Sequence, residues 1–269
     1  MRNRPAVTAL IVTAGLLVPV LLPDVSAAQT PDVSAAGTEF RPGQFVIWPS
    51  GSLAFPTGRF AEEDLDSSSL KIGLKTLGYD AALDLGYVLS EDAIIGLAFG
   101  YSRYSFDLTP EILSIYRERG IEVDAGHSAT IQAHAWLRYL LPEPFPYWRP
   151  YVVLGAGVGR PKGTVEYAGP THLGELSVVD QESTVNLSAF MTGGVGSLIP
   201  VSPQLAFCCE ARYNRISSKG TARTDAFTLE DGSTVEVKYG EEGGEQFRLK
   251  AKSNTEWWEV RAGILFFLK

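Results

Sequence analysis

The chain has 269 residues, of which 45% are hydrophobic and 20% charged, with 27 Gly, 16 Pro and two Cys. This composition excludes a disordered chain, a collagen, a coiled coil and a disulfide-stapled scaffold. The 31 acidic residues outnumber the 23 basic ones, and the formal net charge of -8 argues against general nucleic-acid binding.

The N-terminal segment has the pattern of a secretory signal peptide. Two arginines precede an uncharged, mostly apolar run over residues 6–22, and three small residues follow it. We therefore expect residues 1–28 to be cleaved and the mature chain to work outside the cytoplasm. Residues 29–43, rich in small residues, are expected to form a flexible lead-in to a single domain over residues 44–269.

The rest of the chain has a period of two in its apolar residues, which is typical of β-strands. Eight strands are predicted, over residues 44–60, 74–89, 93–108, 127–141, 148–166, 183–199, 203–218 and 254–268. The connections after the second, fourth and sixth strands are short, whereas those at about 61–73, 109–126, 167–182 and 219–253 are long and charged. This alternation predicts an all-β fold, an eight-stranded antiparallel up-and-down transmembrane β-barrel with tight turns at one rim and long loops at the other.

Each predicted strand has one apolar face and one mixed or polar face. A soluble barrel buries the apolar face, whereas a membrane barrel turns it toward lipid. The spacing of aromatic residues favours the membrane, because eight residues separate Tyr79 from Tyr87 and Trp258 from Phe266. Eight residues rise by about 20 Å at a tilt near 40°. We interpret these four residues, with Tyr213, as an interfacial aromatic girdle.

Charged residues on the polar faces are expected to pair inside the barrel. Antiparallel neighbours have a constant sum of residue numbers, so one register sets Arg212 opposite Glu259 and Glu210 opposite Arg261. An unpaired ion in a protein-lined interior is costly. We therefore predict a lumen salt-bridge cluster of Asp84, Arg138, Glu210, Arg212, Glu259 and Arg261. The cluster acts either as a plug or as a gate that exchanges partners and admits ions.

Two glycine patterns have structural interpretations. Gly155, Gly157 and Gly159 have the spacing of part of a dinucleotide-binding loop, but no helix follows them, so we expect them on the inside of a strand. Asp231-Gly232 between two alternating runs predicts a hairpin within the last long loop. The adjacent Cys208 and Cys209 are expected to be free thiols, and neither they nor the three His have zinc-ligand spacing, so no metal and no cofactor are expected.

Several segments then carry a family resemblance: the hairpin from Leu85-Gly86-Tyr87 to Phe99-Gly100-Tyr101, the strand entry Arg149-Pro150-Tyr151, the strand Glu210-Ala211-Arg212-Tyr213, and the final strand. Over residues 44–269 the chain resembles the small eight-stranded outer-membrane barrels of the OmpA, OmpX and OmpW type. Its C-terminal residues are similar to the assembly signal of that family, with Arg261, Gly263, Phe266 and Leu268 at the polar, glycine, aromatic and hydrophobic positions. The resemblance implies the outer membrane of a Gram-negative-type bacterium, with outer-membrane lipid, lipopolysaccharide and the barrel-assembly machinery as partners.

Eight strands enclose an interior just wide enough for side chains, so a general porin is excluded. We expect a structural or surface-interaction protein of the cell envelope, not an enzyme, with long acidic loops over a plugged lumen and an external partner that the sequence does not identify. The alternative is a narrow transporter for small apolar molecules of the OmpW kind, lined by Trp48, Trp136 and Phe190. A soluble ligand-binding barrel and a lipid A-modifying enzyme are further alternatives. The adjacent His127 and Ser128 point to opposite faces of a strand, which argues against joint catalysis.

Overall fold

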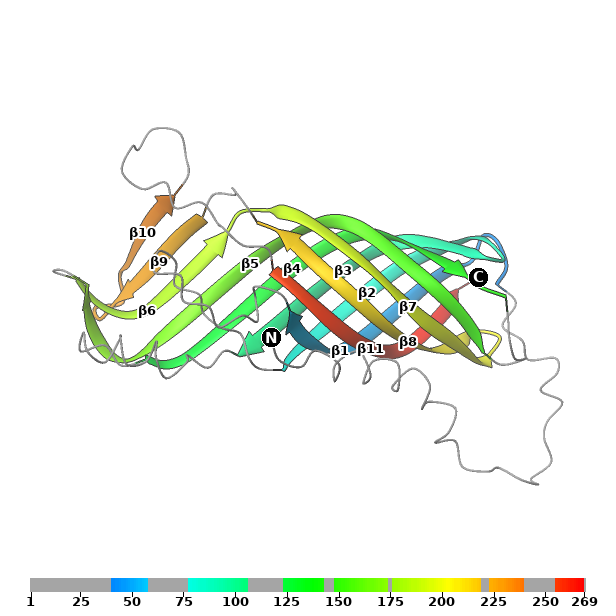
Figure 1. Ribbon diagram of the computed structural model, residues 1–269, viewed down its shortest axis with the longest axis horizontal. Helices are drawn as coiled ribbons and strands as arrows, with labels where there is room; N and C mark the ends of the chain where they lie inside the picture. Colours follow the sequence, from blue (N-terminus) through cyan, green and yellow to red (C-terminus); the bar gives the residue numbers. More distant parts are fainter. Residues whose placement is uncertain are drawn as a thin grey trace, which may run out of the picture. The chain divides into compact units, whose positions relative to one another are not determined.

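The computed structural model is an all-β fold (Figure 1). It describes residues 40–57, 77–105, 123–142, 148–173, 176–218, 223–239 and 255–268. Within these residues the strands are β1 (Phe45–Thr57), β2 (Gly78–Ser90), β3 (Ala93–Ser105), β4 (Val123–Leu140), β5 (Arg149–Leu173), β6 (Leu176–Val185), β7 (Ser188–Ser202), β8 (Leu205–Ser217), β9 (Arg223–Leu229), β10 (Thr234–Tyr239) and β11 (Thr255–Leu268). None of these described residues belongs to a helix long and apolar enough to cross a membrane.

Eight of the strands close into an antiparallel barrel, as the sequence predicts. Neighbours in the barrel follow the order β1, β2, β3, β4, β5, β7, β8 and β11, and β11 pairs with β1 to complete the ring. The other three strands, β6, β9 and β10, continue the sheet from the second half of β5 (Figure 1). We call β6, β9 and β10, with the part of β5 that pairs with β6, the sheet extension.

Two predicted segments differ from the structure next to this extension. The predicted strand 183–199 is two strands, because β6 ends at Val185 and β7 begins at Ser188. Both pair with β5, but the other neighbour of β6 is β9, whereas that of β7 is β8. The predicted loop at 167–182 is largely the hairpin of β5 and β6. The polar residues of this segment have a composition typical of a loop. In the hairpin, however, polar side chains make cross-strand contacts, such as the 2.6 Å ion pair of Lys162 and Glu182. The hairpin predicted around Asp231 and Gly232 is confirmed, with Gly232 at φ 81° between β9 and β10.

The two rims of the barrel differ in the way the sequence predicts. Only Glu91 and Asp92 connect β2 to β3, and only Pro203 and Gln204 connect β7 to β8. We call this rim the turn end and the opposite rim, nearer the sheet extension, the loop end. The predicted long connections at 61–73 and 109–126 lie largely outside the described residues. About half of the predicted connection at 219–253 is described, and it forms β9 and β10.

Apolar side chains cover the outside of the barrel and charged side chains lie inside it. Along the strands, exposed residues alternate with buried ones, and the exposed large hydrophobic residues include Ile131 (65% exposed) and Leu154 (64%). Asp84, Arg138 and Arg212 are at most 1% exposed. A soluble barrel has the reverse arrangement, so the outer wall matches a lipid environment.

The residues before β1 close the turn end of the lumen. Phe40 is 3% exposed, and its ring packs edge-on against Phe267 with 5.3 Å between centroids. Gly43 adopts φ 96° and donates a backbone hydrogen bond to Val88 at 3.0 Å. Residues 40–43, the end of the predicted lead-in, thus pack against the barrel through Phe40 and Gly43. The predicted signal peptide and residues 29–39 lie outside the described residues.

Candidate functional site

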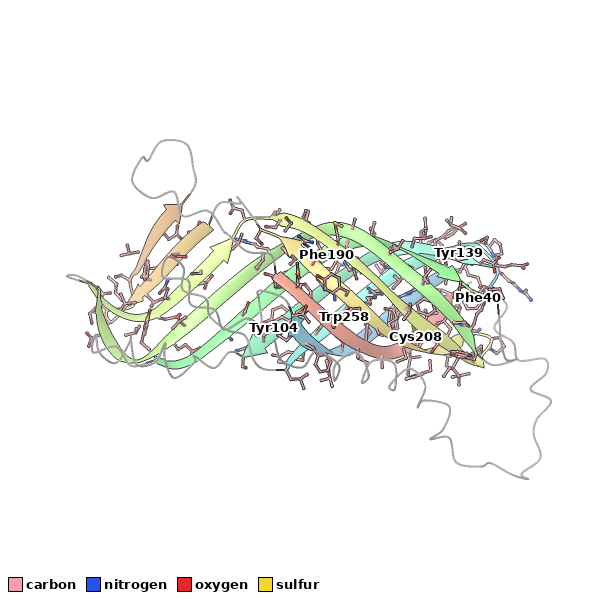
Figure 2. The ribbon with its side chains drawn as sticks, in the orientation of Figure 1. Phe40, Tyr104, Tyr139, Phe190, Cys208 and Trp258 are labelled. Atoms are coloured by element: carbon pink, nitrogen blue, oxygen red, sulfur yellow. The ribbon has the colours of Figure 1, made fainter. Side chains whose placement is uncertain are left out.

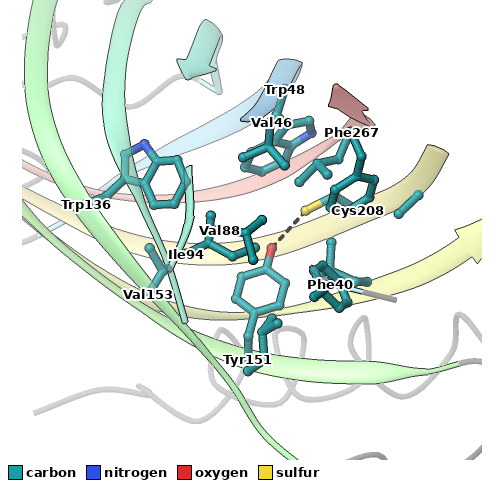
Figure 3. Close-up of a cluster of buried hydrophobic side chains, with 14 of the residues drawn as sticks. Phe40, Val46, Trp48, Val88, Ile94, Trp136, Tyr151, Val153, Cys208 and Phe267 are labelled. Atoms are coloured by element: carbon teal, nitrogen blue, oxygen red, sulfur yellow. Dashed lines mark hydrogen bonds between the residues drawn. The ribbon is translucent and has the colours of Figure 1, made fainter. Parts of the chain in front are cut away.

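An apolar cluster occupies the lumen at the turn end (Figure 3). Its members come from all eight barrel strands and from Phe40, and they pack around Trp48, Tyr151 and Phe267. The Tyr151 hydroxyl lies 2.9 Å from the Cys208 sulfur and donates to Glu210 Oε1 at 2.7 Å. Tyr151 therefore joins the apolar cluster to the charged layer above it.

Arg138 lies at the centre of that charged layer. Its guanidinium donates to Asp84 at 2.7 Å and to Glu210 at 2.9 Å. The same group lies between two indole rings, 4.3 Å from the centroid of Trp48 and 4.2 Å from that of Trp136. These cation–π contacts with the two tryptophans offset part of the free energy that it costs to remove the Arg138 guanidinium from water.

Two further arginines complete the network from the neighbouring strands β8 and β11. Arg212 donates to Glu210 and, at 3.3 Å, to Asp84. Arg261 donates to Asp84 at 3.3 Å and to Asp80 at 3.4 Å. We call the seven residues of this layer the lumen network, and they are Asp80, Asp84, Arg138, Glu210, Arg212, Glu259 and Arg261.

The structure brings the six predicted cluster residues together, but through contacts other than the predicted ones. The register does set Arg212 opposite Glu259 and Glu210 opposite Arg261. Arg261 nevertheless lies 2.9 Å from Glu259 on its own strand, and Arg212 bonds Glu210 on its own strand. Inward side chains of a narrow barrel point toward the axis, so they meet residues from opposite strands as readily as their lateral neighbours.

Sequence reasoning missed Asp80 as a member of the network. Asp80 accepts hydrogen bonds from Ser102 at 2.7 Å and from Arg261 at 3.4 Å. The signal was present, because Asp80 precedes Asp84 by four residues and a period of two sets both on one face.

An aromatic layer lies above the network toward the loop end (Figure 2). Trp257 packs against Tyr104 and Phe190 with centroid distances of 6.3 and 6.1 Å, and Phe190 lies 4.7 Å from the ring of His134. Several buried polar atoms nearby have no hydrogen-bond partner in the protein, and they belong to Gln132, His134, Thr192 and Asn214. Gly157 leaves room for His134, since a Cβ there would collide with that residue, and a Cβ on Gly155 would collide with the Thr192 side chain.

The predicted girdle residues all lie on the outer wall, at two levels. Toward the loop end, Tyr213 packs on Trp258 with 5.4 Å between ring centroids, and Tyr79 is 53% exposed. At the turn end, Tyr87 packs on Phe45 at 5.3 Å, and Phe266 is exposed. The two levels bound an apolar band that includes Ile131, Leu154 and the other exposed apolar side chains of the wall.

The residues of the predicted assembly signal divide between the two faces of β11. Arg261 points inward into the lumen network, while Phe266 and Leu268 are exposed on the outside. Gly263 faces Trp48 so closely that a Cβ would collide with the Trp48 ring and with the Pro49 carbonyl. Recognition of this segment by an assembly machinery stays a prediction.

His127 and Ser128, the adjacent pair weighed for joint catalysis, contact different residues. His127 Nδ1 lies 3.9 Å from Glu166, whereas the Ser128 hydroxyl donates to the Lys162 carbonyl at 3.2 Å. No group of three His, Cys, Asp or Glu in this part of the chain is placed to hold a metal ion. Cys208 and Cys209 are free thiols.

Comparisons with known proteins agree with the barrel. No family model and no curated protein matches the sequence. Among solved structures, the chain is similar to a major outer membrane protein from Thermus thermophilus, with 13% identity, a TM-score of 0.50, and coverage of 85% of this chain and 100% of that chain. It also matches Neisserial surface protein A (17% identity, 82% and 96% coverage, TM-score 0.43) and OprG from Pseudomonas aeruginosa (12%, 85% and 97%, TM-score 0.46). The chain therefore has the fold of the small outer-membrane β-barrels.

Proposed function

We propose that this protein is an outer-membrane anchor with a closed lumen, whose loop end contacts envelope components or an external partner. The observation that carries the proposal is the lumen network, in which Arg138 bonds carboxylates from two other strands and stacks between two indoles. Side chains held from several directions do not leave the pore axis without breaking buried ion pairs. The apolar cluster with Phe40 adds a second barrier at the turn end.

The asymmetry of the barrel supports its orientation. Outer-membrane barrels turn their short connections to the periplasm and their long ones to the outside. The turn end is then periplasmic, and the sheet extension lies outside the cell together with the long loops. Lipid and lipopolysaccharide at the outer wall, and the barrel-assembly machinery at β11, are the partners that this orientation supports.

Conductance in a planar lipid bilayer tests the closed lumen. The unmodified protein should give no steady current, whereas D84A/R138A/E210A, which removes the centre of the network, should give discrete channels. R215A is the matched control, because Arg215 forms an exposed pair with Glu256 at 3.5 Å outside the lumen. Steady channels from the unmodified protein would contradict the closed anchor.

One observation favours a second function, a narrow transporter. Buried donors and acceptors without a protein partner, on His134, Gln132, Thr192 and Asn214, lie in the loop-end half of the lumen. Such atoms normally bond to water or to a ligand. Uptake of small apolar molecules into vesicles should exceed that of protein-free vesicles if this function holds, and should equal it if the lumen is closed.

A further inference from the structure

The outer wall changes from apolar to basic at the loop-end edge of the apolar band. On β3 the exposed Tyr101 is followed by the outward-facing Arg103, and on β5 the exposed Val158 is followed by Arg160 and Lys162. Two residues along a strand correspond to about 7 Å. Three cations therefore lie directly above the part of the wall that faces hydrocarbon.

The pairing of the strands brings these three side chains to one place. Arg103 is opposite Ala129, and Ala129 is opposite Lys162. Two strand spacings of about 4.8 Å thus separate Arg103 from Lys162. Ala129 between them is small, so no bulky side chain divides the patch, and the long side chains of Arg103, Arg160 and Lys162 can converge on one group.

The girdle fixes the height of the patch relative to a membrane. Tyr79 is directly opposite Arg103 on the neighbouring strand β2 and is 53% exposed. Exposed tyrosines of this kind lie at the level of lipid headgroups. The three cations therefore lie at the boundary between hydrocarbon and water, where the phosphates of a lipid headgroup lie.

The positive charge of the patch comes from its two arginines. Among the described residues no carboxylate forms an ion pair with Arg103 or Arg160, while Lys162 pairs with Glu182. Burial lowers the pKa of His127, and Arg103 and Lys162 act in the same direction, whereas the carboxylates of Glu166 and Asp180 act against them. On the far side of the barrel the basic residue near the Tyr213 level, Arg215, is neutralised by Glu256. Lys162 is paired in the same way, and the carboxylates of Glu166, Asp180 and Glu182 border the patch toward the loop end. Among the described residues, Arg103 and Arg160 therefore carry the positive charge of this part of the wall.

We infer that Arg103, Arg160 and Lys162 form a binding site for the phosphate of a phosphorylated lipid headgroup in the outer leaflet. An arginine guanidinium binds phosphate through two parallel hydrogen bonds, and the two positive charges of Arg103 and Arg160 match the charge of a phosphate monoester. The ammonium of Lys162 has three donors, of which Glu182 uses one, so it can add a further hydrogen bond. The acyl chains of the same lipid would lie along Val158 and Ile131 directly below. This inference rests on the proposed orientation, in which the loop end faces outward.

Binding of a defined lipid tests the site. The protein is placed in phosphatidylcholine nanodiscs with diphosphoryl lipid A, and native mass spectrometry measures the bound fraction. R103Q/R160Q should bind at least about tenfold more weakly, because each arginine removes charge-assisted hydrogen bonds. The matched control R215Q should bind like the unmodified protein. Closed, detergent-resistant barrels migrate differently on a denaturing gel before and after boiling, and this heat-dependent gel shift in every variant shows that each one is folded.

Two outcomes would overturn the inference. If R103Q/R160Q and the unmodified protein bound lipid A equally well, Arg103 and Arg160 would not form a phosphate site. Complete competition by millimolar inorganic phosphate would show a site for free phosphate instead of a headgroup, whereas a lipid site keeps its ligand. The assay does not depend on conductance, so a failure here leaves the closed lumen intact, and an open lumen leaves the lipid site intact.

Discussion

Replacing Arg138 with methionine tests whether the lumen network stabilises the barrel. The variant R138M keeps the length and the apolar stem of the side chain and removes its charge. It deletes the hydrogen bonds to Asp84 at 2.7 Å and Glu210 at 2.9 Å, and the stacking against Trp48 and Trp136. Both carboxylates stay buried, with Arg212 as their remaining shared partner.

The expected cost follows from the burial of the groups left behind. Removing one partner of a fully buried ion pair costs about 3–5 kcal/mol, because the other charge stays in a medium of low dielectric constant. Lost cation–π contacts increase this cost, and the remaining bonds of Glu210 to Arg212 and Tyr151 reduce it. We therefore expect a loss of about 3–5 kcal/mol in the free energy of unfolding. The double variant R138M/E210Q should regain about half of the lost free energy of unfolding, because it no longer buries one of the two carboxylates that Arg138 had paired with.

Unfolding in urea, followed by the heat-dependent gel shift of the barrel, measures these free energies. At an m-value of about 2 kcal/mol per molar urea, R138M should unfold at a midpoint lower by about 2 M. The exposed R215M should change the free energy by no more than about 1 kcal/mol. An unchanged midpoint for R138M would refute the role assigned to the network. The same follows if R138M/E210Q loses as much stability as R138M and a separately measured E210Q variant lose together.

Three further outcomes follow from the structure. G194A should lower stability by about 1–3 kcal/mol in the same urea assay, since its Cβ would collide with the backbone of β8, whereas the outward G193A, whose Cβ would make only ordinary contact with Leu154, should be neutral. Burial raises the pKa of Asp180, and the carboxylates of Glu166 and Glu182 act in the same direction. Ionisation of Asp180 therefore lowers the stability of the folded state once the pH rises above the pKa that this group has in the unfolded chain. D180N should therefore slow amide exchange in the sheet extension at pH 7 and leave it unchanged near pH 3, and equal exchange at pH 7 would contradict this. In liposomes a membrane-permeant maleimide should label the partly exposed Cys209 before the buried Cys208, and rapid labelling by a charged reagent would contradict a lipid-facing Cys209.

The sequence predicts the barrel well because the barrel depends on local patterns. Alternation along each strand fixes which face is apolar, and the lengths of the connections fix which ends meet in tight turns. The same alternation sets Glu210, Arg212, Glu259 and Arg261 on the inside, and their spacing gives the register found between β8 and β11. Each of these features involves one strand or two adjacent ones.

Features that involve non-adjacent elements could not be predicted in this way. In the sheet extension β9 pairs with β6, although β7 and β8 lie between them in the chain. The sequence of β6 or of β9 alone does not indicate which strand it pairs with. Phe40 lies in a stretch of small residues with no period, so its burial against Phe267 depends on the closed rim. The stacking of Arg138 between Trp48 and Trp136 likewise depends on how the side chains of the barrel converge on its axis.

A charge exchange separates pairing by strand register from pairing across the lumen. E210R/R261E keeps opposite charges at the two positions that are laterally paired on β8 and β11. In the structure, however, residue 210 faces Arg138 and Arg212, and residue 261 faces Asp80, Asp84 and Glu259. The double exchange then creates repulsion at both positions, so it should be at least as unstable as E210R alone. Recovery of stability in E210R/R261E would show that lateral pairs dominate, and the contacts across the lumen would then contribute little.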